Sequence, residues 1–263
     1  MSAFRKLASA VLVLASLAAL PHTAAAQTGE IVEAVQPVRL YLDGEQTRLD
    51  VGDTVKVGDT VLTGEGASAQ ILFQDETKIV VGPNSQMKLD NLLFRKDNTA
   101  RKFAVRATRG TFRFLSGNSP KEAYSVKTPI ATMGVRGTVF DFTVPSQRNT
   151  DLLVHDGEVQ FCRRGRNSCA TVQRGCQTIQ MDSRRWNQPQ TEGERSSLLA
   201  ALFPFAISQD RLRPEFRANI GACESSDSSR PVAQVRVRST GNPLRESSPS
   251  SAPSGGGSGN PAE

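Results

Sequence analysis

Apolar and polar residues alternate in short runs through most of the chain, and glycine, proline, asparagine or aspartate separates these runs. The pattern continues from Val35 to about Met181 without any long helical periodicity. Short alternating runs bounded by turn residues are typical of β-strands. The sequence therefore predicts an all-β domain over residues 35–185, a size that one hydrophobic core can serve.

Two local patterns refine this picture. The repeat VGDTVKVGDTV, from Val51 to Val61, predicts two tight turns at Gly52 and Gly58 around a very short strand. The runs SAQILF and KIVVG predict a β-hairpin with Asp75 and Glu76 at its tip. Adjacent carboxylates could serve acid–base chemistry, but at a hairpin tip we expect both side chains to face water.

Three segments repeat weakly, each with a glycine turn followed by alternation: RGTFRF, RGTVFDF and DGEVQF. Their glycines, Gly110, Gly137 and Gly157, are 27 and 20 residues apart. This irregular spacing fits a β-sandwich or a short β-solenoid with loops of unequal length, and the sequence does not decide between them.

The pattern changes after Trp186. Helical spacing predicts a helix from Glu194 to Phe203, ended by Pro204, and a second from Ser208 to Ala218 with Ser208 as N-cap. Together they form a short helical appendage over residues 190–223. Residues 224–263 are rich in serine, proline and glycine, which predicts a disordered tail.

The N-terminus has the layout of a secretory signal peptide. Arg5 and Lys6 precede an apolar segment, and three alanines end at Ala26, so residues 1–26 are expected to be removed on export. Later apolar runs are too short to cross a bilayer, so we expect a periplasmic or secreted protein that does not span the membrane.

Four cysteines follow the expected cleavage site, and an even number in an oxidising compartment predicts two disulfides. Of the three possible pairings we favour Cys162 with Cys169, which closes a hairpin loop, and Cys176 with Cys223. Zinc is the alternative, but the CxxC spacing is missing and His155 is the only histidine after the signal. We expect neither metal nor cofactor.

Charge adds little. Without Arg5 and Lys6, 30 bases and 26 acids leave a net charge of +4. Bases gather in RRGR at Arg163, Arg164 and Arg166, which could contact an anionic envelope polymer but read more simply as a solvated loop. Nucleic acid is not expected as a partner, because aromatic residues do not alternate with these bases.

The segment TPIATMGVRGTVFDFTV interrupts a β-branched run with two glycines and an arginine. Gly134 and Gly137 predict a turn around Arg136, whose guanidinium could bind neighbouring carbonyls, Asp141 or Asp156. The signature residues are Thr128, Pro129, Gly134, Arg136, Gly137 and Thr138, and we expect their role to be structural.

This segment, preceded by VGDTVLTGEGASAQILFQDETKIVVGPNSQMKL, resembles the FecR domain family over roughly residues 51–181. Family members of this kind resemble transmembrane relays between an iron-siderophore receptor and a sigma factor. The present chain has a cleavable signal in place of their cytoplasmic part. The resemblance therefore implies a secreted, stand-alone FecR-like domain.

For function, we expect a non-enzymatic protein-interaction or signalling module of the envelope, with an unidentified envelope protein as partner. The alternative is a binding module for an anionic glycan or polysaccharide. An enzyme would have to use Asp141, or Asp156 with Glu158, as paired carboxylates, or His155 in a serine triad, and the sequence has no GxSxG nucleophile motif.

Overall fold

The computed structural model describes residues 28–224 and 227–239, except for the side chains of Arg136 and Ser239. The expected signal peptide, residues 1–26, and residues 240–263 of the expected tail lie outside this part. Strands make up most of the described chain, which confirms the all-β prediction. The strands are β1 Thr28–Val35, β2 Val38–Leu42, β3 Glu45–Arg48, β4 Thr54–Lys56, β5 Thr60–Thr63, β6 Ser68–Phe73, β7 Lys78–Val81, β8 Gln86–Phe94, β9 Ala100–Leu115, β10 Tyr124–Lys127, β11 Ala131–Ser146, β12 Asn149–Arg163, β13 Ser168–Gln173, β14 Gln177–Asp182, β15 Trp186–Asn187 and β16 Val237–Ser239.

The strands form two layers that face each other, as in a sandwich. The first, which we call the covered layer, runs β4, β1, β6, β7, the second half of β9, the second half of β11, the first half of β12, β14 and β15. The second, the open layer, runs β3, β2, β5, β8, the first half of β9, β10, the first half of β11, the second half of β12, β13 and β16.

Three long strands, β9, β11 and β12, pass from one layer to the other, so all strands belong to one hydrogen-bonded sheet. Each changes layer at a glycine with positive φ: Gly110, Gly137 and Gly157. At Gly157 a Cβ atom would lie 2.3 Å from the carbonyl oxygen of Gly137, so only glycine fits there. The weak sequence recurrence therefore marks these changes of layer and not the coils of a regular solenoid.

The core lies between the layers and is rich in phenylalanine. Phe103 of the open layer packs edge to face on Phe73 of the covered layer, with ring centroids 4.8 Å apart, and lies 6.0 Å from Phe114. Phe114, Phe140 and Phe142 continue the stack along the covered layer. The alternation in FRF and FDF thus places phenylalanines inside and the residues between them on the outer face.

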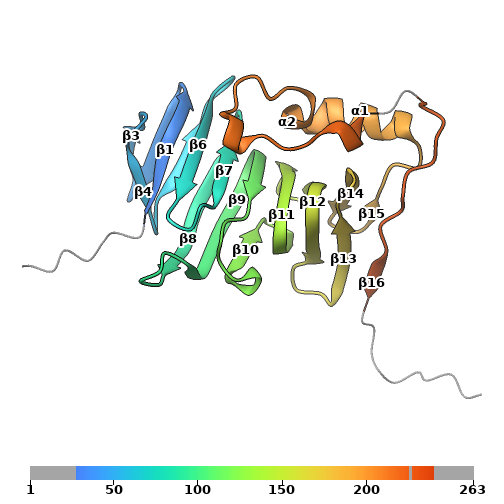
Figure 1. Ribbon diagram of the computed structural model, residues 1–263, viewed down its shortest axis with the longest axis horizontal. Coiled ribbons are helices and arrows are strands. Elements are labelled where there is room, and N and C mark those ends of the chain that lie inside the picture. Colours follow the sequence, from blue (N-terminus) through green and yellow to red (C-terminus); the bar gives the residue numbers. More distant parts are fainter. Residues whose placement is uncertain (1–27, 225–226, 240–263) are drawn as a thin grey trace, which may run out of the picture.

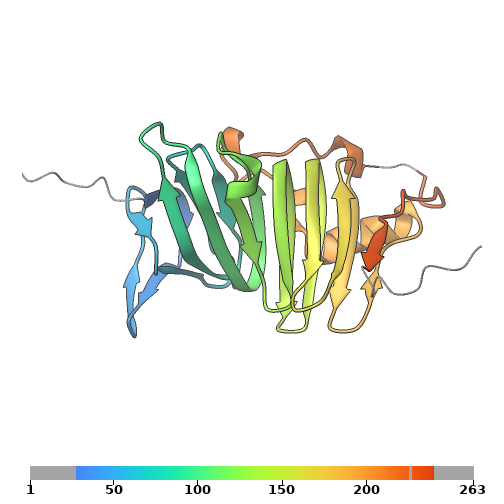
Figure 2. The same cartoon turned by 90° about the horizontal axis from the view of Figure 1, so that it is seen from below.

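The chain after β15 lies across the outer face of the covered layer, and we call residues 192–223 the strap (Figure 1). It contains α1 Glu192–Leu202, α2 Pro204–Ile207 and two 3₁₀ turns, Pro214–Phe216 and Gly221–Cys223; a third, Lys121–Ala123, precedes β10. Figure 2, seen from below, shows strands toward the viewer and the helices behind them. Both α-helices of the described chain thus lie on the covered layer, whereas the 3₁₀ turn Lys121–Ala123 lies beside Gly134 and Gln160 of the open layer.

Several expectations about this part were wrong. Helix α1 begins two residues earlier than predicted and is capped by Thr191, whose side chain accepts the Glu194 N–H. Pro204 ends α1 but also starts α2, because proline suits a first helical turn. Ser208–Ala218 is not a helix, since Pro214 holds Arg213 in an extended conformation.

The domain limits also change. Strand β1 begins at Thr28, before the predicted start at residue 35. Residues 227–239 are not a structureless tail: Val235 is buried in the main core and exchanges two hydrogen bonds with Gln188. Strand β16 then pairs with β13, matching Arg238 with Cys169.

Candidate functional site

The site begins with a row of residues that lie opposite one another on the outer face of the covered layer. The strand register aligns Gln70 with Val80, Val80 with Arg113, Arg113 with Asp141 and Asp141 with Leu153. Side chains of one such row are close neighbours. The row therefore presents an amide, an ion pair and two apolar side chains in one line beneath the strap.

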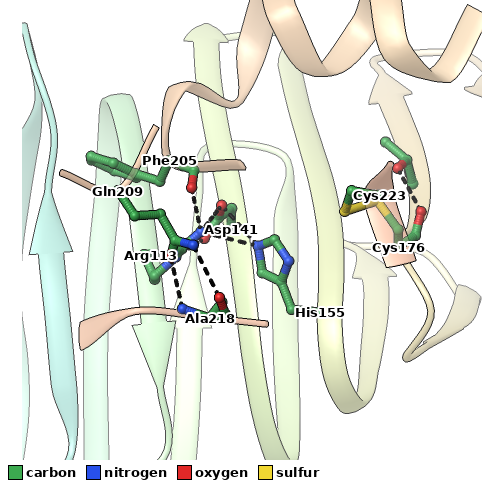
Figure 3. Close-up of polar contacts among 9 residues, drawn as sticks. Arg113, Asp141, His155, Cys176, Phe205, Gln209, Ala218 and Cys223 are labelled. Carbon is green, nitrogen blue, oxygen red and sulfur yellow. Dashed lines mark hydrogen bonds and ion pairs between the residues drawn. A yellow bond between two sulfur atoms is a disulfide. The ribbon is translucent and has the colours of Figure 1, made fainter. Parts of the chain in front are cut away.

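Arg113 is the centre of this row (Figure 3). Its Nε and one terminal nitrogen donate to the two carboxylate oxygens of Asp141 at 2.6 and 2.8 Å. The same terminal nitrogen donates to the Phe205 carbonyl at 2.9 Å, and the other donates to the Gln209 amide oxygen. Both Arg113 and Asp141 are 0% exposed, so the pair is fully withdrawn from water.

The strap closes around this pair. The Gln209 side chain accepts the Ala218 N–H at 2.8 Å and donates to the Ala218 carbonyl at 3.0 Å, which fixes the loop between them (Figure 3). Nearby, the Gln70 side chain donates to the Arg211 carbonyl at 2.9 Å and accepts the Arg213 N–H at 3.0 Å. The strap is thus held on the sheet by hydrogen bonds to its backbone groups and to the side-chain amide of Gln209.

Apolar contacts hold both ends. Val80 packs with Phe205, Leu212 and Phe216. Leu153 packs with a second group made of Cys176, Leu199, Phe203, Ala206 and Cys223. The disulfide between Cys176 and Cys223 ties the end of the strap to the turn before β14.

Electrostatics agree with this geometry. Burial by itself raises the pKa of Asp141, but the Arg113 guanidinium and then His155 outweigh burial and lower the pKa to about 2. Asp141 therefore remains ionised under all ordinary conditions. Asp151, two positions before Leu153 in β12, has no such cation: burial raises its pKa to about 7, against the effect of a hydrogen bond from Gln180.

Two residues that the sequence suggested separately for catalysis, His155 and Asp141, lie together in the structure. His155 Nε2 lies 3.0 Å from Asp141 Oδ2. In a serine triad the other ring nitrogen faces a hydroxyl nucleophile, whereas His155 Nδ1 has no hydrogen-bond partner among the described residues. With 1% of its side chain exposed, His155 is sealed beneath the strap and serves to position Asp141.

Other predicted carboxylates lie elsewhere. Asp75 does not face water: it is 2% exposed and accepts hydrogen bonds from Ser119 at 2.6 Å and Tyr124 at 2.9 Å. Of the two tip carboxylates, only Glu76 is exposed. The buried Asp75 ties the hairpin to the loop before β10, so the two tip carboxylates do not act together.

The predicted turn at Gly134 and Gly137 is a bulge inside one continuous strand. Gly134 pairs with Ser125 and Gln160, and the register of β11 with β12 shifts after Arg136. The side chain of Arg136 lies outside the described part, so its binding to Asp156 stays a prediction; the other partner considered, Asp141, is bound by Arg113.

The remaining signature residues make hydrogen bonds that fix the backbone around them. Thr128 is buried; its side chain accepts the Ala131 N–H and hydrogen-bonds to Thr150. The Thr138 N–H donates to Ser116 Oγ at 2.9 Å. The carbonyl of Pro129 accepts from Arg164.

The RRGR bases do not form one solvated cluster. Arg163 is 7% exposed, donates to the Asp182 and Arg185 carbonyls, and lies over the Trp186 ring. Arg164 donates to the Thr128 and Pro129 carbonyls. Arg166 is exposed. The prediction of a joint anionic contact therefore fails for Arg163, because the fold uses its guanidinium.

Both disulfides have the favoured pairing, Cys162 with Cys169 and Cys176 with Cys223. No cysteine is left to ligate zinc. Within the described ranges, His, Cys, Asp and Glu form no group of three or more that could hold a metal ion. Likewise, none of the described helices has both the length and the apolarity that a membrane span requires.

Sequence reasoning missed Arg113 and Gln209. A signal for Arg113 existed, because in TFRFL the arginine alternates with two core phenylalanines and must face outward, opposite the aspartate of VFDFT. Gln209 gave no signal, since its role depends on how the strap returns over the sheet.

Comparison with known proteins gives the following results. The family model of the FecR protein matches residues 59–160. A search of curated proteins finds no match. Two crystal structures of a candidate anti-sigma factor from Parabacteroides distasonis ATCC 8503, at 1.65 and 2.50 Å resolution, are similar at 15% identity and a TM-score of 0.39. They cover 53% of this chain, and the match spans 64% and 63% of those chains, which is less than two thirds of their length. The FecR family match therefore lies within residues 51–181, the stretch whose sequence resembles the FecR domain family.

Proposed function

We propose that this chain is a non-enzymatic module of the cell envelope that is exported to the periplasm and acts in signalling or regulation by binding another protein. The observation that carries this proposal is the strap interface. Among its buried ionisable groups, Arg113 donates to the Phe205 carbonyl of the strap, while Asp141 binds the Arg113 guanidinium and is itself contacted by His155. They leave a rigid scaffold whose other faces are available to a partner.

The match to the FecR family supports the same proposal, because the resemblance described above implies a regulatory role for members of this family. The two disulfides suit an oxidising compartment, which supports export. The alternative, an anionic glycan as ligand, is favoured by one observation, the exposed bases on the outer face of the open layer.

The experiment is crosslinking in cells that export the full chain, followed by purification and separate analysis of protein and wall polymer. Capture of the same envelope protein by wild type and by a His155→Gln control, to equal extents, supports the proposal. The reason is that binding should not depend on the buried histidine. Polysaccharide without protein supports the glycan alternative. Capture of neither, or turnover of any envelope substrate that His155→Gln abolishes, contradicts the proposal.

A further inference from the structure

Three bases lie side by side on the outer face of the open layer. The register places Lys88 of β8 opposite Arg106 of β9, and Arg106 beside Lys127 of β10. Lys88 and Arg106 are exposed and Lys127 is half-buried. Successive strands are about 4.8 Å apart, so these cations form a short line across the strands.

Carboxylates of the chain itself neutralise little of the positive charge of this line. Asp90 binds Arg106, with carboxylate-to-guanidinium distances of 2.9 and 3.1 Å. Among the described residues, neither Lys88 nor Lys127 forms an ion pair. Like charges directly opposite in a sheet are destabilising, so the row opposes the stability of the fold.

Gly134 adds an independent observation on the same face. It lies inside β11 next to Ser125, its φ is not positive, and the nearest atoms to an added Cβ, both of Gln160, are 3.9 Å away. Neither backbone conformation nor packing requires glycine here. Strand glycines occur at bulges and bends and where a ligand or another backbone approaches closely. The register of β11 shifts only after Arg136, so close approach is the reason that remains for Gly134.

Gly134, which has no side chain, borders a hollow of about 190 Å³. The hollow is lined by Lys121, Glu122, Tyr124, Gly134, Val135 and Gln160. Since Ser125 pairs with Gly134 and the next residues of β10 lead to Lys127, the hollow and the line of bases are adjacent.

We propose that this face, made of Lys88, Arg106, Lys127 and the hollow at Gly134, binds an extended acidic segment of a partner protein. The inference rests on the proposed function and names the chemistry of its partner. Carboxylates of the segment neutralise the bases, and its backbone comes close to the sheet where Gly134 has no side chain. A glycan would call for exposed aromatic platforms, whereas Tyr124, the aromatic residue in the wall of the hollow, is 4% exposed.

The test uses the full exported chain and a synthetic peptide of twelve alternating glutamate and serine residues, with glutamine replacing glutamate as the neutral control. We expect saturable binding of the acidic peptide that weakens as salt is raised, and no binding of the neutral one. The triple variant Lys88→Gln, Arg106→Gln, Lys127→Gln should weaken binding by about tenfold or more.

A matched variant, Arg174→Gln, Arg184→Gln, Arg185→Gln, removes the same charge from exposed positions elsewhere and should bind like wild type. Gly134→Thr should fold and bind at least about threefold more weakly, because its side chain fills the hollow. Equal loss in both triple variants, or equal binding of the acidic peptide by all variants, overturns the proposal.

Failure of this inference is distinguishable from failure of the proposed function. A chain that ignores the acidic peptide but still captures an envelope protein in cells retains the function and loses this docking face. Preference for polygalacturonate over the peptide, lost in the first triple variant only, replaces the protein segment with an anionic glycan.

Discussion

Strand β9 carries two arginine–aspartate pairs, one on each outer face of the molecule. Arg106 contacts Asp90 on the open layer, and its side chain is 47% exposed; Arg113 contacts Asp141 on the covered layer, where both side chains are 0% exposed. The chemistry is the same, but only the second pair is roofed by the strap. Burial therefore turns one pair into a structural anchor and leaves the other available to solvent and partners.

The largest difference between the two pairs is expected when each arginine is replaced. Arg113→Ala leaves the Asp141 carboxylate buried without its cation, which should cost about 3–5 kcal/mol of unfolding free energy. Arg106→Ala should cost less than about 1 kcal/mol, because water screens the exposed pair. Urea unfolding of both variants measures the difference, and equal losses would contradict the assignment of the strap as a structural roof.

The two disulfides repeat the comparison on a smaller scale. Cys176 and Cys223 are 47 residues apart in sequence, and Cys162 and Cys169 are 7 apart. Loop-closure entropy gives about 4 kcal/mol for the first and about 2.5 kcal/mol for the second. We expect Cys176→Ser/Cys223→Ser to lower the thermal midpoint more than Cys162→Ser/Cys169→Ser; the reverse order would mean that the strap adds little to stability.

Two buried carboxyl groups of the covered layer, Asp151 and Asp141, have pKa values that are shifted in opposite directions. The pKa of Asp151 is raised to about 7, so the folded state holds a proton that the unfolded chain releases near pH 4, and stability falls as pH rises from about 4 to 7. Asp151→Asn should remove this loss. At about 1.4 kcal/mol per pKa unit, the whole shift corresponds to about 4 kcal/mol. We expect Asp151→Asn to recover about half of this, about 2 kcal/mol of unfolding free energy at pH 8.

The pKa of Asp141 is lowered to about 2, so its contribution has the opposite sign: it is present above pH 4 and is lost as pH falls toward 2. Melting curves of wild type and Asp151→Asn from pH 2 to 8 check both statements. Parallel curves above pH 4 would show that Asp151 is not buried as described.

The smallest expected effect concerns Gly134. Because its φ is ordinary and a Cβ has room, Gly134→Thr should raise the unfolding free energy by about 0.5–1 kcal/mol. Gly157→Thr is the contrasting variant and should be clearly destabilising, since a Cβ there would lie 2.3 Å from the Gly137 carbonyl oxygen. Loss of stability in Gly134→Thr would show that this glycine has a structural role after all.

The sequence predicted those features that depend on local pattern. Alternation identified the β domain, the Gly-Asp turns and the hairpin, and strand positions identified the cysteine pairing. It failed where long-range contacts decide: Arg163 became buried because Trp186 and two carbonyls lie within reach, and Asp75 because Ser119 and Tyr124 return to it. The strap site was beyond pattern reasoning, since it joins residues about 100 positions apart.

We expect partners to contact the open layer, because the strap closes the covered one. To test this, photocrosslinking residues are placed singly in the full exported chain at Lys88 and Lys102, exposed residues of β8 and β9 on the open layer, and at the exposed Arg211 on the strap. The account predicts crosslinks to one envelope protein from positions 88 and 102 and none from 211. Crosslinks from 211 alone would contradict it and would make the strap the binding surface.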